Sequence, residues 1–293
     1  MTIELLAPAA AEAPTRFVER HGRRIAYRET GSGTPLILCL RFRGVLDSWD
    51  PAFLDALAAE FRVITFDYSG LGQSGGAASY RAEVMARDAI DLADALGIES
   101  FAVGGWSLGG MAAQVVTAMV PERVTHLVLI GTTPPGRVEH PSEAAFLEHA
   151  LKPVNDLADE EILFFEPASA SSRAAAAASN ARIAARSADR SPPIAPETYL
   201  ALLQDRHAED LFPDAGGYRD FLANCGIPIL VIAGDHEIVF PTPNWFALNR
   251  VWKSLHLMVL PQMGHGPQHQ APEFVADLIK SFVRTRQRAD VAA

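Results

Sequence analysis

The alternation of short apolar runs with longer helix-like stretches constrains this chain more than any other feature of its sequence. Parallel strands need crossover connections and lie buried between helices, so this alternation is typical of a mostly parallel sheet covered on both faces. We therefore predict an α/β fold with a mostly parallel, eight-stranded sheet flanked by helices. The expected strands are a hairpin within 17–27 and runs at 35–40, 62–66, 101–104, 124–130, 227–233 and 256–260, and the expected helices are 52–60, 80–96, 108–119, 243–249 and 272–284.

The alternation stops in the middle of the chain. Residues 135–226 contain no clear strand, and an Ala-rich stretch at 171–188 has high helix propensity. We predict that this segment is a helical cap or lid inserted into the sheet domain, with the core formed by 15–134 and 227–286. The alternative is a disordered linker, against which the apolar groups Leu163-Phe164-Phe165 and Tyr199 to Leu203 argue, since they offer anchoring contacts.

Charge and cysteine content narrow the classes of partner. The formal net charge of -10 argues against nucleic acid and anionic membranes. Cys39 and Cys225 have no metal-ligand spacing, and the N-terminus lacks the basic start and apolar stretch of a secretory signal. We expect a cytoplasmic protein that acts on a small-molecule substrate without a metal or other cofactor. The sequence leaves open whether it is a monomer or a homodimer.

The segment Gly105-Trp106-Ser107-Leu108-Gly109 is a G-x-S-x-G motif between an expected strand and an expected helix. In that context the serine occupies a tight, strained turn that projects its hydroxyl above the sheet. The start of the following helix favours a developing negative charge. We interpret Ser107 as a nucleophile. The structural alternative is an ordinary helix-capping serine in a glycine-rich turn.

The best candidate for a general base is His265, which lies between two glycines in a loop that follows a late strand. Its ordinary pKa suits proton transfer near neutral pH. The carboxylate that orients it is expected after the preceding strand, where both Asp235 and Glu237 are available. We favour Glu237, because it lies further out along the loop, and keep Asp235 as the less favoured alternative. The order serine, acid, histidine differs from that of two unrelated classes of serine protease.

With these motifs the sequence resembles the α/β-hydrolase family over nearly its whole length. The segment DYSGLGQS at 67–74 is similar to a D-x-x-G-x-G-x-S turn of that family. The family's placement of its acid three residues after a glycine supports Glu237. The resemblance also implies that the main-chain N–H groups of Phe42 and Leu108 form an oxyanion hole. The sequence departs from the family here, because Leu40-Arg41 stands where relatives usually have His-Gly.

Two arginines, Arg41 and Arg43, therefore lie close to the expected site, and we consider two readings of them. In the first they point outward or form structural ion pairs. In the second an arginine holds a substrate carboxylate or the oxyanion, and Arg41, together with Trp106, is then a candidate substrate-binding residue. Changing Arg41 to Met would, in the second reading, impair anionic substrates far more than neutral ones.

The function that these residues indicate is two-step acyl transfer. We predict a serine hydrolase that cleaves a carboxylic ester or lactone by a Ser-His-Glu triad through an acyl-enzyme. The first alternative is a carbon–carbon bond hydrolase of a diketone-type substrate. The turn that carries Ser107 is called the nucleophile elbow, and relatives whose elbow resembles Ser107-Leu108-Gly109-Gly110 include such enzymes. An alternative of another class is a non-catalytic protein that binds a small ligand on a hydrolase fold.

Overall fold

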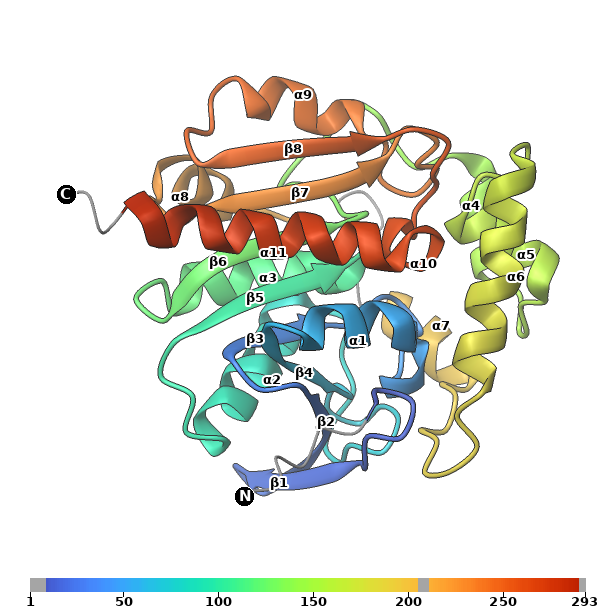
Figure 1. Cartoon of the computed structure of the whole chain (residues 1–293), viewed down its shortest axis with the longest axis horizontal. Helices are drawn as coiled ribbons and strands as arrows, with labels where there is room; N and C mark the ends of the chain where they lie inside the picture. Colours follow the sequence, from blue (N-terminus) through green and yellow to red (C-terminus); the bar gives the residue numbers. More distant parts are fainter. Residues whose placement is uncertain (1–8, 205–210, 290–293) are drawn as a thin grey trace, which may run out of the picture.

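The computed structural model of the protein describes residues 9–204 and 211–289, and its centre is one eight-stranded sheet (Figure 1). The strand order is β1-β2-β4-β3-β5-β6-β7-β8. β2 pairs antiparallel with β1 and β4, and all pairs from β4 to β8 are parallel. The strands are β1 Arg16–Arg20, β2 Arg23–Thr30, β3 Thr34–Cys39, β4 Phe61–Phe66, β5 Phe101–Trp106, β6 Val124–Ile130, β7 Ile229–Gly234 and β8 Leu255–Leu260. The predicted α/β fold with a mostly parallel, eight-stranded sheet is confirmed.

Helices cover both faces of this sheet, which explains why its central strands are apolar throughout. In β5 and β7 every residue is buried, whereas the edge strand β8 is partly exposed. Figure 1 shows α1 (Pro51–Ala58) and α11 (Pro272–Ala289) together on one face, with α2 (Ala82–Ala95) and α3 (Leu108–Met119) on the other. α1 begins where Asp50 accepts a hydrogen bond from the Ala52 N–H and Pro51 occupies the first turn.

The segment between β6 and β7 is helical, and among the described residues between 135 and 226 there is no strand. It contains α4 Ala144–Ala150, α5 Leu157–Phe164, α6 Ala170–Ala184, α7 Pro196–Gln204 and α8 Tyr218–Asn224. Helices α4 to α7 lie beyond the ends to which β7 and β8 point (Figure 1). α8 instead packs against α3 beside the sheet. The division into 15–134, 135–226 and 227–286 as separate parts stays a prediction.

The second half of the sheet carries the remaining short helices, α9 (Pro243–Asn249) and α10 (Pro267–Gln270), and a 3₁₀ turn, Leu46–Ser48, follows β3. None of the helices in the described part of the chain combines the length and the apolar character needed to cross a membrane. The carboxyl ends of the neighbouring parallel strands β3, β5, β6 and β7 lie at the edge of the sheet that faces helices α4 to α7. This is the edge at which an open α/β sheet ordinarily binds its ligand.

Candidate active site

Ser107 occupies the turn between β5 and α3 in a strained backbone conformation. Its φ of 59° and ψ of -123° are rare for a residue with a side chain, and cost of order 1–3 kcal/mol. Neighbouring strands hold the turn in place: the Ser107 N–H donates to the carbonyl of Ile130 at 2.9 Å, and its carbonyl accepts from the Thr132 hydroxyl at 2.7 Å. Only 5% of the Ser107 surface is exposed. The elbow conformation expected from the sequence is thus present.

Two glycines allow the close packing of main-chain atoms around the turn at Ser107. A Cβ atom at Gly105 would lie 2.1 Å from the Gly109 carbonyl oxygen, and one at Gly109 would lie 2.1 Å from the Cys39 carbonyl oxygen. Both contacts are to main-chain atoms, which cannot move aside without displacing a strand or a helix. The glycines of the motif are therefore required by close packing among β3, β5 and α3.

We expect Gly109→Ala to lower the free energy of unfolding by about 3 kcal/mol, the upper range for forcing a methyl group into a packed interior. Gly226→Ala is the matched control, because a Cβ there meets no atom within 4 Å and needs no positive φ. Denaturant titration of both variants measures the difference. Equal stabilities for the two variants would show that the elbow tolerates the added methyl group.

His265 and Glu237 meet directly in the buried part of the site. His265 Nδ1 lies 2.7 Å from Glu237 Oε2, and the two side chains are 2% and 0% exposed. Glu237 Oε1 accepts from the N–H groups of Val239 at 2.7 Å and Phe240 at 3.2 Å, which fixes the carboxylate. A proton on Nδ1 is then held by Glu237, leaving Nε2 as the basic atom of the neutral ring.

Asp235, the less favoured acid, is turned away from this contact. Its side chain is 39% exposed, and its carboxylate lies 2.6 Å from Nδ1 of the neighbouring His236. The structure therefore brings Glu237 to His265 and leaves Asp235 at the surface. The raised pKa of His236 follows from its hydrogen bond with Asp235.

Two further residues position the histidine loop. The indole N–H of Trp106 donates to the His265 carbonyl at 2.8 Å, and Trp106 is almost completely buried. At Gly131, where φ is +47°, a Cβ would lie 2.5 Å from the His265 carbonyl oxygen and 3.2 Å from Glu237 Oε2. Our sequence reasoning missed Gly131. The signal for it was a glycine directly after an apolar strand that runs beside the nucleophile strand.

Ser107 and His265 line one cavity of about 100 Å³, and Phe42 and Leu108, the expected oxyanion donors, line it as well. The rest of its wall is largely apolar and comes from α3, the helices above the sheet and the loop after Glu237. These apolar residues include Met111, Phe146, Leu151, Leu163, Val239 and Phe240. Such a wall suits a small substrate whose non-reacting part is apolar.

The loop after β3 forms a tight turn in which the Gly44 N–H donates to the Arg41 carbonyl at 3.0 Å. The residue of this turn with positive φ is Arg43, at +57°, and Arg41 has no positive φ. The backbone strain of the altered segment therefore lies one residue beyond Phe42.

Arg43 fixes the helical segment to this loop. Its guanidinium donates to the carbonyls of Ala150 at 2.9 Å, Lys152 at 2.8 Å and Pro153 at 3.0 Å, and to Asn155 Oδ1 at 3.2 Å. It also lies 4.3 Å above the ring of Tyr199. These contacts favour the structural reading for Arg43.

Arg43→Met should release the connection between α4 and α5 from the sheet. We expect amide hydrogen exchange in peptides covering 144–164 to accelerate at least about tenfold, with β5 and β6 unchanged, because several charge-assisted hydrogen bonds are lost together. Arg43→Lys keeps the charge but cannot reach four oxygens in a planar fork, so its exchange rates should be intermediate. Exchange in 144–164 that matches wild type in both variants would contradict this role.

Comparison with known proteins agrees with the fold. Residues 34–272 match the family described as alpha/beta hydrolase fold. The chain is 25% identical to the pimeloyl-acyl-carrier-protein methyl ester esterase of Nitrosomonas europaea, over 83% of this chain and 93% of that protein. An alpha/beta hydrolase fold protein from Chitinophaga pinensis superimposes with a TM-score of 0.80 at 26% identity, over 94% of this chain and 99% of the other.

Curated relatives with higher identity match a shorter region. At 34–36% identity the aligned segments are 105–109 residues long and cover 39–42% of those relatives. The family match, at 34–272, includes strands β3 to β8, Ser107 and His265. The chain belongs to the alpha/beta hydrolase fold family.

Proposed function

We propose that this protein is a serine hydrolase that cleaves a small-molecule carboxylic ester or lactone through an acyl-enzyme. The observation that carries the proposal is the buried contact of 2.7 Å between His265 Nδ1 and Glu237 Oε2, beside the strained Ser107 in the same cavity. The esterase named above, which matches most of this chain, supports an ester as the substrate class.

In the first step His265 Nε2 takes the Ser107 proton as the hydroxyl oxygen attacks the carbonyl carbon. Glu237 stabilises the imidazolium ion through Nδ1. The negative charge on the former carbonyl oxygen is received by the N–H groups of Phe42 and Leu108, and one such donor typically lowers the barrier by about 3 kcal/mol. The imidazolium then protonates the departing alkoxide, which leaves the acyl group on Ser107.

In the second step a water molecule loses its proton to His265 and attacks the acyl carbon. The tetrahedral intermediate collapses, Ser107 recovers its proton, and the carboxylic acid leaves. Each proton that His265 accepts is returned, so the cycle consumes only water and substrate. The chemistry needs no cofactor, because the side chains named here supply every proton transfer.

Treatment with a fluorophosphonate probe, followed by mass spectrometry of the digested protein, tests this proposal. We expect one adduct, on Ser107, and none in Ser107→Ala. A panel of esters, lactones and diketones then separates ester cleavage from carbon–carbon bond cleavage. A folded protein that the probe does not label would contradict the proposal and favour a non-catalytic ligand-binding protein.

A further inference from the structure

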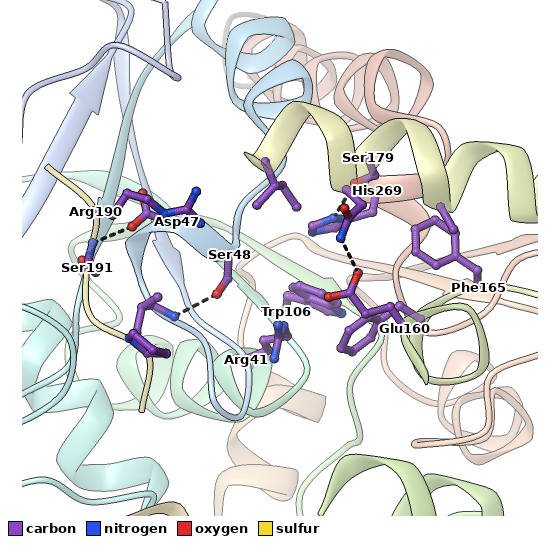
Figure 2. A pocket seen from close by; sticks show the side chains of 16 residues that line it. Arg41, Asp47, Ser48, Trp106, Glu160, Phe165, Ser179, Arg190, Ser191 and His269 are labelled. Carbon is purple, nitrogen blue, oxygen red and sulfur yellow. Dashed lines mark hydrogen bonds between the residues drawn. The ribbon is translucent and has the colours of Figure 1, made fainter. Parts of the chain in front are cut away.

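A second, larger cavity of about 440 Å³ shares part of its wall with the one that Ser107 lines. Figure 2 shows the side chains that line this second cavity. It lies between α5, α6 and the loop after β3, and the side chains of Arg41 and Phe164 line both cavities. In contrast to the cavity at Ser107, much of its wall is polar. Its polar lining includes Arg41, Glu160, Asn180, Arg190 and His269.

Arg41 forms no ion pair among the described residues, although the negative charge of Glu160 in the same wall acts on it. One of its terminal nitrogens donates to the Phe42 carbonyl at 2.7 Å, while its Nε is buried and has no hydrogen-bond partner among the residues that the structure describes. Over residues 9–204 and 211–289, no carboxylate lies within 4 Å of its guanidinium, which rests instead against the rings of Trp106 and Phe164. Burial lowers the pKa of Arg41 to about 10, so the side chain still carries its charge at neutral pH. A desolvated charge without a partner is costly, which suggests that a ligand completes the site.

His269 adds a second unsatisfied group. It is 5% exposed, its Nδ1 lies 3.0 Å from the Ser179 hydroxyl oxygen, and its Nε2 has no hydrogen-bond partner in the described part of the chain. Burial lowers the pKa of His269 to about 4, so the ring is neutral at pH 7. When Ser179 donates to Nδ1, the proton resides on Nε2, and His269, which lines the cavity, carries a buried N–H donor.

The carboxylates of the same wall, Glu160 and Asp47, already accept hydrogen bonds from other residues. Glu160 accepts from Asn180 Nδ2 at 3.1 Å. Asp47 accepts from Arg28 at 2.7 Å and from the Ser191 N–H at 2.6 Å. The two groups of this wall that lack a partner among the described residues, Arg41 Nε and His269 Nε2, are therefore donors, and one of them is positively charged. Such a set recognises an anionic ligand with hydrogen-bond acceptors and disfavours a cation.

We propose that the polar cavity binds a carboxylate carried by the substrate, with Arg41 as its counter-ion. The preferred substrate is then an ester or lactone that also bears a free acid group. This inference rests on the proposed function, because it places the reacting carbonyl at Ser107 and the acid group in the polar cavity, next to Arg41. It also gives a role to the arginine that stands where the family usually has glycine.

Binding can be measured without turnover in Ser107→Ala. The ligands for isothermal titration calorimetry are the monomethyl esters of glutarate, adipate and suberate, which carry the free acid on the acyl part of the ester. Acetoxybutyrate carries it on the alcohol part instead. The fully methylated esters are the neutral controls. We expect at least one acid to bind at least about tenfold more tightly than its neutral control. Adding Arg41→Met should remove that preference, whereas Arg87→Met, which removes a positive charge from the exposed side of α2, should keep it.

Kinetics on the protein with Ser107 intact provides the second readout. The same acid should have a kcat/KM at least about tenfold above that of its neutral control, and Arg41→Met should reduce this ratio to about one. Arg41→Lys should retain part of the preference, since it keeps the charge. His269→Phe should lower the ratio of kcat/KM for the acid to kcat/KM for its neutral control.

Three outcomes separate this inference from the proposed function. Equal binding and cleavage of acids and neutral controls by the protein with Arg41 intact would overturn the inference, as would equal loss on both substrates in Arg41→Met. Arg41-dependent binding of an acid to a protein that the fluorophosphonate probe does not label would support the carboxylate cavity and refute the hydrolase. Labelling at Ser107 without acid preference would do the reverse.

Discussion

We expect His265→Ala to lower kcat for the best ester substrate by a factor between about 10⁴ and 10⁶. Among the described residues, this side chain is the one titratable group that contacts Glu237 and also lines the cavity with Ser107. Without it, the serine hydroxyl must lose its proton to water, and only binding and the oxyanion donors continue to act. Loss of the base in a serine hydrolase is typically as severe as loss of the whole triad. Single-turnover and steady-state kinetics measure the change.

His236→Ala is the matched control for this prediction. Its imidazole lies in the loop that also carries Glu237, but it is half exposed and contacts Asp235 and Glu166. We expect its kcat to stay within about threefold of wild type, because substitutions of exposed residues away from the chemistry seldom matter. Comparable losses in both variants would mean that His265 is not the base, and that any histidine change in these loops disturbs the site.

The sheet could be predicted closely because local rules decide it. The helices at 108–119 and 243–249 and the strand at 124–130 have the bounds expected from the sequence. Apolar runs with glycine or proline at their ends leave few alternatives for a strand between two helical layers. The elbow was equally local, since five consecutive residues specify it.

The helical segment above the sheet was predicted as helical, but its packing could not be read from hydrophobicity. The buried residues of α6 are Ser172, Ala176 and Ser179, which follow a helical spacing but are small or polar. Ser172 donates to Gln270 at 2.6 Å, and Ser179 contacts His269. A helix that packs through small residues and hydrogen bonds has almost no apolar stripe, so periodicity cannot reveal which face is buried.

Contacts between distant parts of the chain could also not be predicted from the sequence. The indole N–H of Trp106 donates to the carbonyl of His265, far along the chain, and the role of Trp106 in substrate binding stays a prediction. Likewise, nothing in the order Arg41-Phe42-Arg43 tells which arginine has positive φ and which faces a cavity. Such assignments depend on the tertiary arrangement of loops, which local patterns do not encode.

Glu237→Gln should lower kcat by about 10³- to 10⁴-fold while leaving KM nearly unchanged. Glu237 Oε1 accepts two main-chain N–H bonds, so the amide oxygen of Gln takes that position and its NH₂ group faces His265. An NH₂ donor favours the tautomer in which Nδ1 is unprotonated and Nε2 carries the proton. Nε2 then cannot accept the Ser107 proton, and a comparable loss is known when a triad aspartate is changed to its amide.

Glu237→Asp and Asp235→Asn complete the assignment of the acid. The shorter Asp withdraws its carboxylate by roughly one carbon–carbon bond from a contact that is now 2.7 Å, and such a displacement costs about 10²-fold. Asp235→Asn should be close to wild type, because that side chain is 39% exposed and does not contact His265. Steady-state kinetics on the three variants gives the ranking Asp235→Asn, Glu237→Asp, Glu237→Gln from most to least active. A severe loss in Asp235→Asn with an active Glu237→Gln would transfer the role to Asp235, and the loop would then have to rearrange when substrate binds.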